Sequence, residues 1–176
     1  MIPRVLRALL CALALPATAN ALAAAPVVNW PAGWQPEEVT VDAHAAASSL
    51  SRQRAVKYDA TGTPVMVMEL TMTEVAPDHV VNVQGVLLEM RKRVQKDFSA
   101  GGYQSVCNRI HPSKLAQLTA FETTCTVTRN GEHVLSQTLV TAVDARRAFV
   151  FSYAGQAAEF SLNQAQILAT RNSLQL

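Results

Sequence analysis

Residues 119–143 read TAFETTCTVTRNGEHVLSQTLVTAV, and this stretch decides the fold class. Two runs rich in β-branched residues flank Asn130-Gly131, a dipeptide typical of two-residue hairpin turns. We therefore predict an antiparallel hairpin of strands 119–129 and 132–143, with one face more apolar than the other. A two-residue turn would set these opposed pairs: Val127 with Val134, Cys125 with Ser136, and Phe121 with Val140.

Strands are also predicted on both sides of this hairpin, at 103–110 and 147–154. The later strand places three aromatic side chains on one face, and Gly155 is expected to end it. The earlier strand is joined to the hairpin by a predicted loop that contains Pro112 and Ser113. The three aromatic residues are Phe149, Phe151 and Tyr153.

The first half of the chain adds a second hairpin. Residues 50–58 and 63–74 form two strand-like runs around a turn at 60–62. In the second run Val65, Val67 and Thr71 alternate with methionine and leucine, so both of its faces are largely apolar. This pattern predicts a central strand that is covered on both sides. A short strand at 37–42 and a loop at 43–49 precede the hairpin.

Two segments have helical spacing. The first carries one apolar stripe, has Asp78 or Asn82 as its N-cap and ends at Gly101-Gly102. The second is residues 156–172. Strands, a helix, four strands and a helix predict an α+β fold, with a mostly antiparallel sheet of six or seven strands packed with two main helices. The stripe of the first helix is Val83, Leu87, Met90, Val94 and Phe98; that of the second is Phe160, Ile167 and Leu168.

The first 23 residues are typical of a secretory signal peptide. Arg4 and Arg7 are followed by an uncharged apolar stretch, which ends in Ala21-Leu22-Ala23. This ending has the small-x-small pattern of a signal-peptidase site, so we predict cleavage after Ala23. The apolar stretch is shorter than the roughly 20 residues of a membrane-spanning helix, which argues against a membrane anchor. Cys11 lies inside the stretch rather than at the cleavage site, which argues against a lipid anchor.

Residues 24–176 have the length of one domain, and no linker or repeat divides them. Without Arg4 and Arg7, the 15 basic residues of the chain fall to 13, equal to its 13 acidic residues. A neutral domain has no electrostatic reason to bind nucleic acid or anionic lipid. We predict a periplasmic protein, or a protein secreted further, that does not span the membrane.

Cys107 and Cys125 are the two cysteines beyond the signal peptide. An even count in an oxidising compartment favours a disulfide. Antiparallel pairing of strands 103–110 and 119–129 about position 116 would also bring these two residues face to face. A redox pair usually has C-x-x-C spacing, whereas these cysteines are 18 residues apart.

No short catalytic motif is present: the sequence has no G-x-S-x-G, no H-E-x-x-H and no glycine-rich phosphate loop. We therefore predict no enzyme activity and no cofactor. A triad is recognised by geometry rather than by sequence order, so a hydrolase stays open as an alternative. The four histidines are scattered over predicted loops and element ends: His44, His79, His111 and His133.

Met66, Met68 and Met72 lie on one face of one predicted strand and are candidate metal ligands. Thioether sulfur suits Cu(I), so a copper carrier is one interpretation. Methionine also fills irregular gaps in apolar cores, and a central strand would bury these sulfurs. We favour core packing.

Two further groups are candidate binding residues. The basic side of the first helix carries Arg91, Lys92, Arg93 and Lys96, which suit an acidic partner, although interleaved acids make an ordinary solvated face the preferred interpretation. Trp30 and Trp34 flank a Pro-Ala-Gly turn; tryptophan anchors interfaces, but it also folds back onto cores. The sequence does not decide between these two roles.

Seven blocks of the chain resemble, in order, an uncharacterised family of exported proteobacterial proteins, described only as a domain of unknown function. The general layout resembles the PsbP-like superfamily, which includes a lumenal subunit of photosystem II and small bacterial lipoproteins. That resemblance implies an α/β/α sandwich and a final Tyr-x-Gly strand followed by a closing helix; the two cysteines match the family pattern. The blocks are WPAGW (30–34), SRQRAVKY (51–58), VMVMELT (65–71), VQGVLLEMRK (83–92), GYQSVC (102–107), FETTCTVTRNGEHVLSQTLV (121–140) and SYAG (152–155).

The resemblance implies a non-catalytic binding or accessory role, although fold does not determine function. Our leading interpretation is an accessory or binding protein of the periplasm that contacts another envelope protein or envelope component. A carrier of a small ligand or of copper is the alternative. An unrecognised hydrolase is the third.

Overall fold

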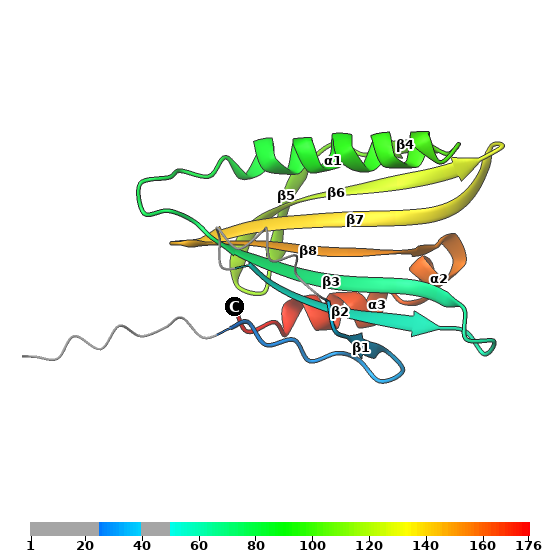
Figure 1. The fold of residues 1–176 in the computed structure, drawn as a ribbon, viewed down its shortest axis with the longest axis horizontal. Helices are drawn as coiled ribbons and strands as arrows, with labels where there is room; N and C mark the ends of the chain where they lie inside the picture. The colour runs from blue at the N-terminus through cyan, green and yellow to red at the C-terminus, as the bar shows by residue number, and fades with distance from the viewer. Residues whose placement is uncertain (1–24, 40–49) are drawn as a thin grey trace, which may run out of the picture.

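The computed structural model describes residues 25–39 and 50–176, so the predicted signal peptide, residues 40–42 and the predicted loop 43–49 lie outside the described residues. Eight antiparallel strands form one sheet in the order β1-β2-β3-β8-β7-β6-β4, with β5 also paired to β6 (Figure 1). The strands are β1 (Gln35–Glu37), β2 (Leu50–Tyr58), β3 (Pro64–Glu74), β4 (Gln104–Cys107), β5 (His111–Leu115), β6 (Leu118–Arg129), β7 (Glu132–Asp144) and β8 (Arg147–Gln156).

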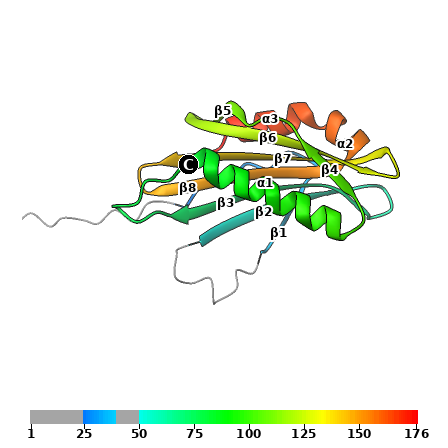
Figure 2. The ribbon, with the colours of Figure 1, turned by 90° about the horizontal axis from the view of Figure 1, so that it is seen from above.

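Helices lie on both faces of the sheet (Figure 2). Helix α1 (Val83–Ala100) packs on β4, β6 and β7, whereas α2 (Ala157–Leu162) packs on β3, β7 and β8. Helix α3 (Gln164–Asn172) follows α2 and contacts β5. These layers confirm the predicted α+β class. No helix of the described residues is long and apolar enough to cross a membrane.

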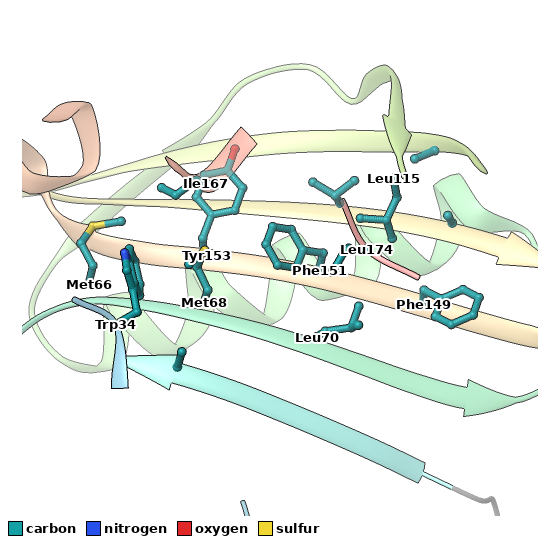
Figure 3. Close-up of a cluster of buried hydrophobic side chains, with 14 residues drawn as sticks. Trp34, Met66, Met68, Leu70, Leu115, Phe149, Phe151, Tyr153, Ile167 and Leu174 are labelled. Carbon is teal, nitrogen blue, oxygen red and sulfur yellow. The ribbon is translucent and has the colours of Figure 1, made fainter. Parts of the chain in front are cut away.

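The main core lies between the sheet and the α2–α3 layer (Figure 3). Phe149, Phe151 and Tyr153 alternate along β8 and point into it together, as their spacing predicts. Met68 and Leu70 of the neighbouring strand β3 are buried beside them. Because one face of each strand supplies this core, the other face of the sheet is free to meet α1 or solvent.

Strand β8 continues through Gly155 to Gln156, so the prediction that Gly155 ends the strand is wrong. A Cβ atom on this residue would collide with the Met66 sulfur and lie 2.6 Å from the carbonyl oxygen of Val65. Glycine therefore allows β3 and β8 to pair closely here, rather than breaking the ladder.

Both ends of α1 follow the predicted capping signals. The side chain of Asn82 accepts a hydrogen bond from the Gly85 amide at 3.0 Å, so Asn82 is the N-cap. Gly101 caps the C-terminus, and Gly102 has a φ of 79°.

The C-terminal segment forms two short helices instead of the single helical segment expected over 156–172, with Asn163 between them. Ile167 is buried as predicted, but Leu168 is 43% exposed. Thr170 and Arg171 are buried in its place.

The hairpin at Asn130-Gly131 is present, and both turn residues have positive φ, as a primed turn requires. Its predicted register is wrong by one residue beyond the turn. Thr128 pairs with His133, but the next pair is Val127 with Leu135, so Val134 is an extra residue in a β-bulge. The observed pairs are Val127 with Leu135, Cys125 with Gln137, and Phe121 with Thr141.

The predicted loop around Pro112 and Ser113 is strand β5, which returns to β6 through a tight turn at Ala116. Proline lacks an amide hydrogen, but an edge strand has one side free of ladder hydrogen bonds and tolerates it. Upstream, Cys107 pairs with Cys125, as antiparallel pairing about position 116 predicts.

Candidate binding face on the sheet

Helix α1 covers only half of its side of the sheet. In the covered half, Leu139 and Thr141 of β7 and Val127 of β6 are buried. In the other half, which we call the open face, most side chains of β2, β3 and β8 remain half-buried, and no helix of the described residues packs on them. The open face consists of Arg52, Arg54, Val56, Val65, Val67, Glu69, Thr71, Val150, Ser152 and Ala154.

The prediction that β3 is covered on both sides is therefore wrong. The alternation that places Val65 and Val67 on this side also places Glu69 and Thr71 there. A helix packed over Glu69 would have to desolvate its carboxylate, which is costly. The polar half of the strand thus stays accessible while its methionine side forms the core.

A charged row crosses the open face. The Nε and Nη2 atoms of Arg54 donate to one oxygen of Glu69, at 2.9 and 2.7 Å. Nε of Arg52 lies 3.4 Å from the other oxygen of Glu69, so two guanidinium groups share one carboxylate. About a third of each arginine side chain is exposed, at 35% for Arg52 and 37% for Arg54.

Tyr58 and Glu37 stand at the edge of the open face, where β1 meets β2. The Tyr58 hydroxyl donates to a carboxylate oxygen of Glu37 at 2.6 Å. This hydrogen bond, with smaller contributions from burial and from the carboxylate charge, raises the pKa of Tyr58 above its ordinary value of 10.0. The phenol therefore stays protonated and links the short edge strand β1 to β2.

A groove of about 470 Å³ lies on the open face beside these rim residues. Its size falls within the range of small-molecule sites. Val56, Val65, Val67 and Ala154 supply an aliphatic floor, and Leu135 extends it toward β7. A second hollow of about 430 Å³ shares Glu37 and Arg54 and reaches Trp30.

The two tryptophans occupy different positions. Trp34 is buried in the core, where its indole Nε1 donates to the Gln166 side chain at 3.1 Å (Figure 3). Trp30 is half-buried, packs against the core and lines the smaller hollow. Trp34 is therefore a core residue, while part of the Trp30 side chain stays accessible beside the open face.

The candidate basic residues of α1 are not gathered into one site. Arg91 donates to the carbonyl oxygen of Asn108 at 3.2 Å, just past the end of β4. Lys92 pairs with Glu89 at 2.7 Å on the same helix. Arg93 and Lys96 are exposed. This arrangement is that of a solvated helix face attached to an edge strand.

The candidate methionines point into the main core. Met66 and Met68 are buried (Figure 3). Met72 packs against the same cluster from a half-buried position. Their cross-strand neighbours on β8 are Gly155, Tyr153 and Phe149, respectively. The thioether groups fill the space between aromatic rings and the sheet, which is the packing role of methionine.

A disulfide joins Cys107 of β4 to Cys125 of β6. Cys125 is buried on the side of the sheet that α1 covers. The bond therefore attaches the edge strand β4, which α1 also contacts, to its neighbour β6.

A buried ion pair that sequence patterning did not suggest holds α3 to the sheet. Nη1 of Arg171 lies 2.8 Å from Oε2 of Glu122, and its Nε donates to the carbonyl oxygen of Lys114 at 2.6 Å. Ser113 completes the cluster through hydrogen bonds with both side chains. Nearby, burial raises the pKa of Tyr153, and the Glu122 charge adds to the rise.

Three histidines lie in the described residues, and His44 falls outside them. His79 precedes α1, His111 begins β5 and His133 lies in β7. Nε2 of His133 is 2.9 Å from the hydroxyl oxygen of Ser136, but it also lies 3.1 Å from the Leu135 carbonyl oxygen. Ser136 is buried, so a substrate cannot reach this pair directly. Among the described residues, no group of three or more His, Cys, Asp or Glu side chains is placed to hold a metal.

Sequence reasoning missed the residues of the open face. Tyr58, Arg54 and Glu69 all lie in runs that it assigned correctly to strands. One signal was available: Glu69 interrupts the otherwise apolar 65–72 segment on the face opposite the methionines. A charged residue inside a strand of a sheet marks a side that is not fully covered.

Solved structures share this architecture. The chain is similar to cyanobacterial PsbP (CyanoP) from Synechocystis sp. PCC 6803, with a TM-score of 0.61, 13% identity and 86% of each chain covered. It is also similar to LpqN from Mycobacterium tuberculosis, described as involved in cell envelope biogenesis, with a TM-score of 0.53, 13% identity and 85% of this chain and 81% of LpqN covered. At this identity the likeness shows the fold alone, and it confirms the predicted class.

Residues 25–176 match the family described as domain of unknown function DUF4946, and the chain belongs to this family. No curated protein matches the sequence. The family assignment agrees with the resemblance seen in the sequence blocks, while a proteobacterial origin stays a prediction.

Proposed function

We propose that this protein is an exported, non-catalytic accessory protein of the cell envelope that binds an envelope component through the open face of its sheet. The observation that carries the proposal is the open face itself: a groove with an aliphatic floor and a rim of Tyr58, Arg54 and Glu37. Tyrosine and arginine are enriched at binding hot spots, because each combines a large contact area with hydrogen-bonding groups. Export is supported by the signal-like residues 1–23 and by the disulfide, which is typical of oxidising compartments.

The two alternatives have less support. A copper carrier would need accessible thioether ligands, but Met66 and Met68 are only 2% and 0% exposed. A hydrolase would need a reachable nucleophile, and in the described part of the chain Ser136, which lies within hydrogen-bonding distance of His133, is buried. Among the described residues, the groove is the feature that best fits a binding role.

In-cell photo-crosslinking tests this proposal with the full-length chain. A photoreactive amino acid replaces Val67 on the open face or, as the matched control, Val106 on the outer edge strand β4, which is 72% exposed. We expect one reproducible adduct from position 67 and none of that mass from position 106, with mass spectrometry identifying the attached species.

Equal adducts from both positions, or an adduct from position 106 alone, would contradict binding through the open face. The same experiment reports export, because the mass of the recovered chain shows whether Ala24 is its first residue.

A further inference from the structure

Two segments on the side of the sheet opposite the open face lack exposed charged side chains. Charged residues make up 16% of the chain, but residues 25–36 contain none. Residues 160–176 contain one, Arg171, and its side chain is buried in the ion pair with Glu122. Charged residues are mostly found on protein surfaces, so their absence from two exposed segments is informative.

The two segments lie side by side (Figure 1). Val27 and Gln175 exchange backbone hydrogen bonds of 2.9 and 3.2 Å, and the Trp34 indole donates to the Gln166 side chain at 3.1 Å. These contacts lie near opposite ends of α3, so the N-terminal segment runs along this helix. We call the outer surface of these two segments the uncharged face. Because both segments are fixed to the core, this face is already formed before a partner binds.

The uncharged face also exposes aliphatic side chains. Leu162 is 77% exposed, Val27 47% and Leu168 43%, and Ala165 and Ala169 of α3 are also exposed. The opposite side of α3 lies in the main core, so this helix is apolar on two sides, whereas a surface helix usually has a charged or polar outer side. Aliphatic surface without charge is typical of the centre of a protein–protein interface.

A second copy of this chain suits such a face. In a two-fold symmetric interface, residues near the axis meet their own images, so a charged side chain there would repel itself. The uncharged face avoids this repulsion, and it offers no charge by which a different partner would be selected. The equal numbers of basic and acidic residues beyond the signal peptide also leave little long-range repulsion between copies. The two segments together have about as many residues as the roughly 20–30 that each partner contributes to a stable interface.

We infer that the uncharged face forms a two-fold symmetric homodimer, with α3 and the N-terminal segment of one copy packed on those of the second copy. Burial of Leu162, Leu168 and Val27 stabilises this dimer in proportion to the apolar area removed from water. The interface lies across the sheet from the open face, so each copy keeps its open face accessible. The inference therefore goes beyond the proposed function and does not depend on it.

Sedimentation equilibrium of the exported, oxidised protein over a range of concentrations tests the inference. We expect a reversible monomer–dimer equilibrium with a micromolar or tighter dissociation constant. Leu168→Glu and Asn172→Lys each place a charge at an exposed position on the same side of α3 without removing a core side chain. We expect each variant to raise the dissociation constant at least about tenfold, because the new charge loses water and lies close to its own image.

Val80→Glu is the matched control. Val80 is 91% exposed in the connection between β3 and α1, so this variant should dimerise as the unmodified protein does. If Leu168→Glu fails to fold, the effect of Asn172→Lys decides.

A monomer at every concentration would overturn the homodimer. So would a dimer that all three variants leave unchanged, or one that Val80→Glu weakens as much as Leu168→Glu does. The in-cell adduct expected from position 67 does not require the dimer, so the proposed function and this inference can fail separately.

Discussion

The covered half and the open face belong to the same side of one sheet, yet they have different surfaces. Under α1, the strands present Leu139, Thr141 and Val127, and helix residue Leu87 is fully buried. On the open face, β2 and β3 present Arg52, Arg54 and Glu69. The open half carries Arg52, Arg54 and Glu69 where the covered half carries mainly aliphatic side chains, and no helix of the described residues packs over these charges. That half is then available for binding.

The largest expected difference between the two halves is in the loss of stability when a side chain is truncated to alanine. We expect Leu87→Ala to lower the free energy of unfolding by about 2–5 kcal/mol, because it leaves a cavity between α1 and the sheet. Val67→Ala on the open face should cost about 1 kcal/mol or less, because its side chain is only half-buried. Urea unfolding followed by circular dichroism measures both values.

One result with this pair of variants would contradict the difference between the two halves. If Val67→Ala costs as much as Leu87→Ala, the open face is packed in solution and is not a binding surface. A matched valine control is Val106→Ala on the exposed edge of β4, which should change the unfolding free energy least of the three.

Sequence reasoning succeeded where a local signal was strong. Asn130-Gly131 determines a turn by its backbone conformations, and Asn82 caps α1 through a hydrogen bond three residues away. The pairing of Cys107 with Cys125 followed from two strands on either side of a short connection. In each of these cases the deciding interaction lies within about 20 residues of the chain.

It failed where the outcome depended on packing between distant segments. The bulge at Val134 shifts the hairpin register, and nothing in the local sequence marks it. Gly155 resembled a strand terminator, but its role is set by Met66 and Val65, which lie about 90 residues earlier. The open face was missed for a related reason: we interpreted strand 65–72 as apolar on both sides despite Glu69, and only the tertiary structure determines that α1 covers β6 and β7 instead.

Removal of the disulfide should affect the covered half of the sheet more than the open face. Cys107→Ala/Cys125→Ala should lower the free energy of unfolding by about 3 kcal/mol, the value for closing a loop of this size in the chain-entropy model. Because the bond joins β4 to β6, hydrogen exchange should accelerate mainly in β4 and α1. The amides of β2 and β3 should keep their relative protection. Equal acceleration of exchange in β2 would show that the two halves unfold as one unit.

The smallest effect concerns the rim of the open face. Since its hydrogen bond to Glu37 holds the pKa of Tyr58 above 10.0, Glu37→Gln should bring that pKa back toward the ordinary value. A raised folded-state pKa favours the neutral hydroxyl, so its contribution to stability is present below pH 10 and is lost as the pH rises through the folded-state pKa. NMR titration of ¹³C-labelled tyrosine measures the change. Tyr153 serves as the internal reference, because its pKa is raised mainly by burial in the core. If Tyr58 titrates identically in both proteins, its hydrogen bond to Glu37 is absent in solution, and only the backbone pairing of β1 with β2 holds this edge.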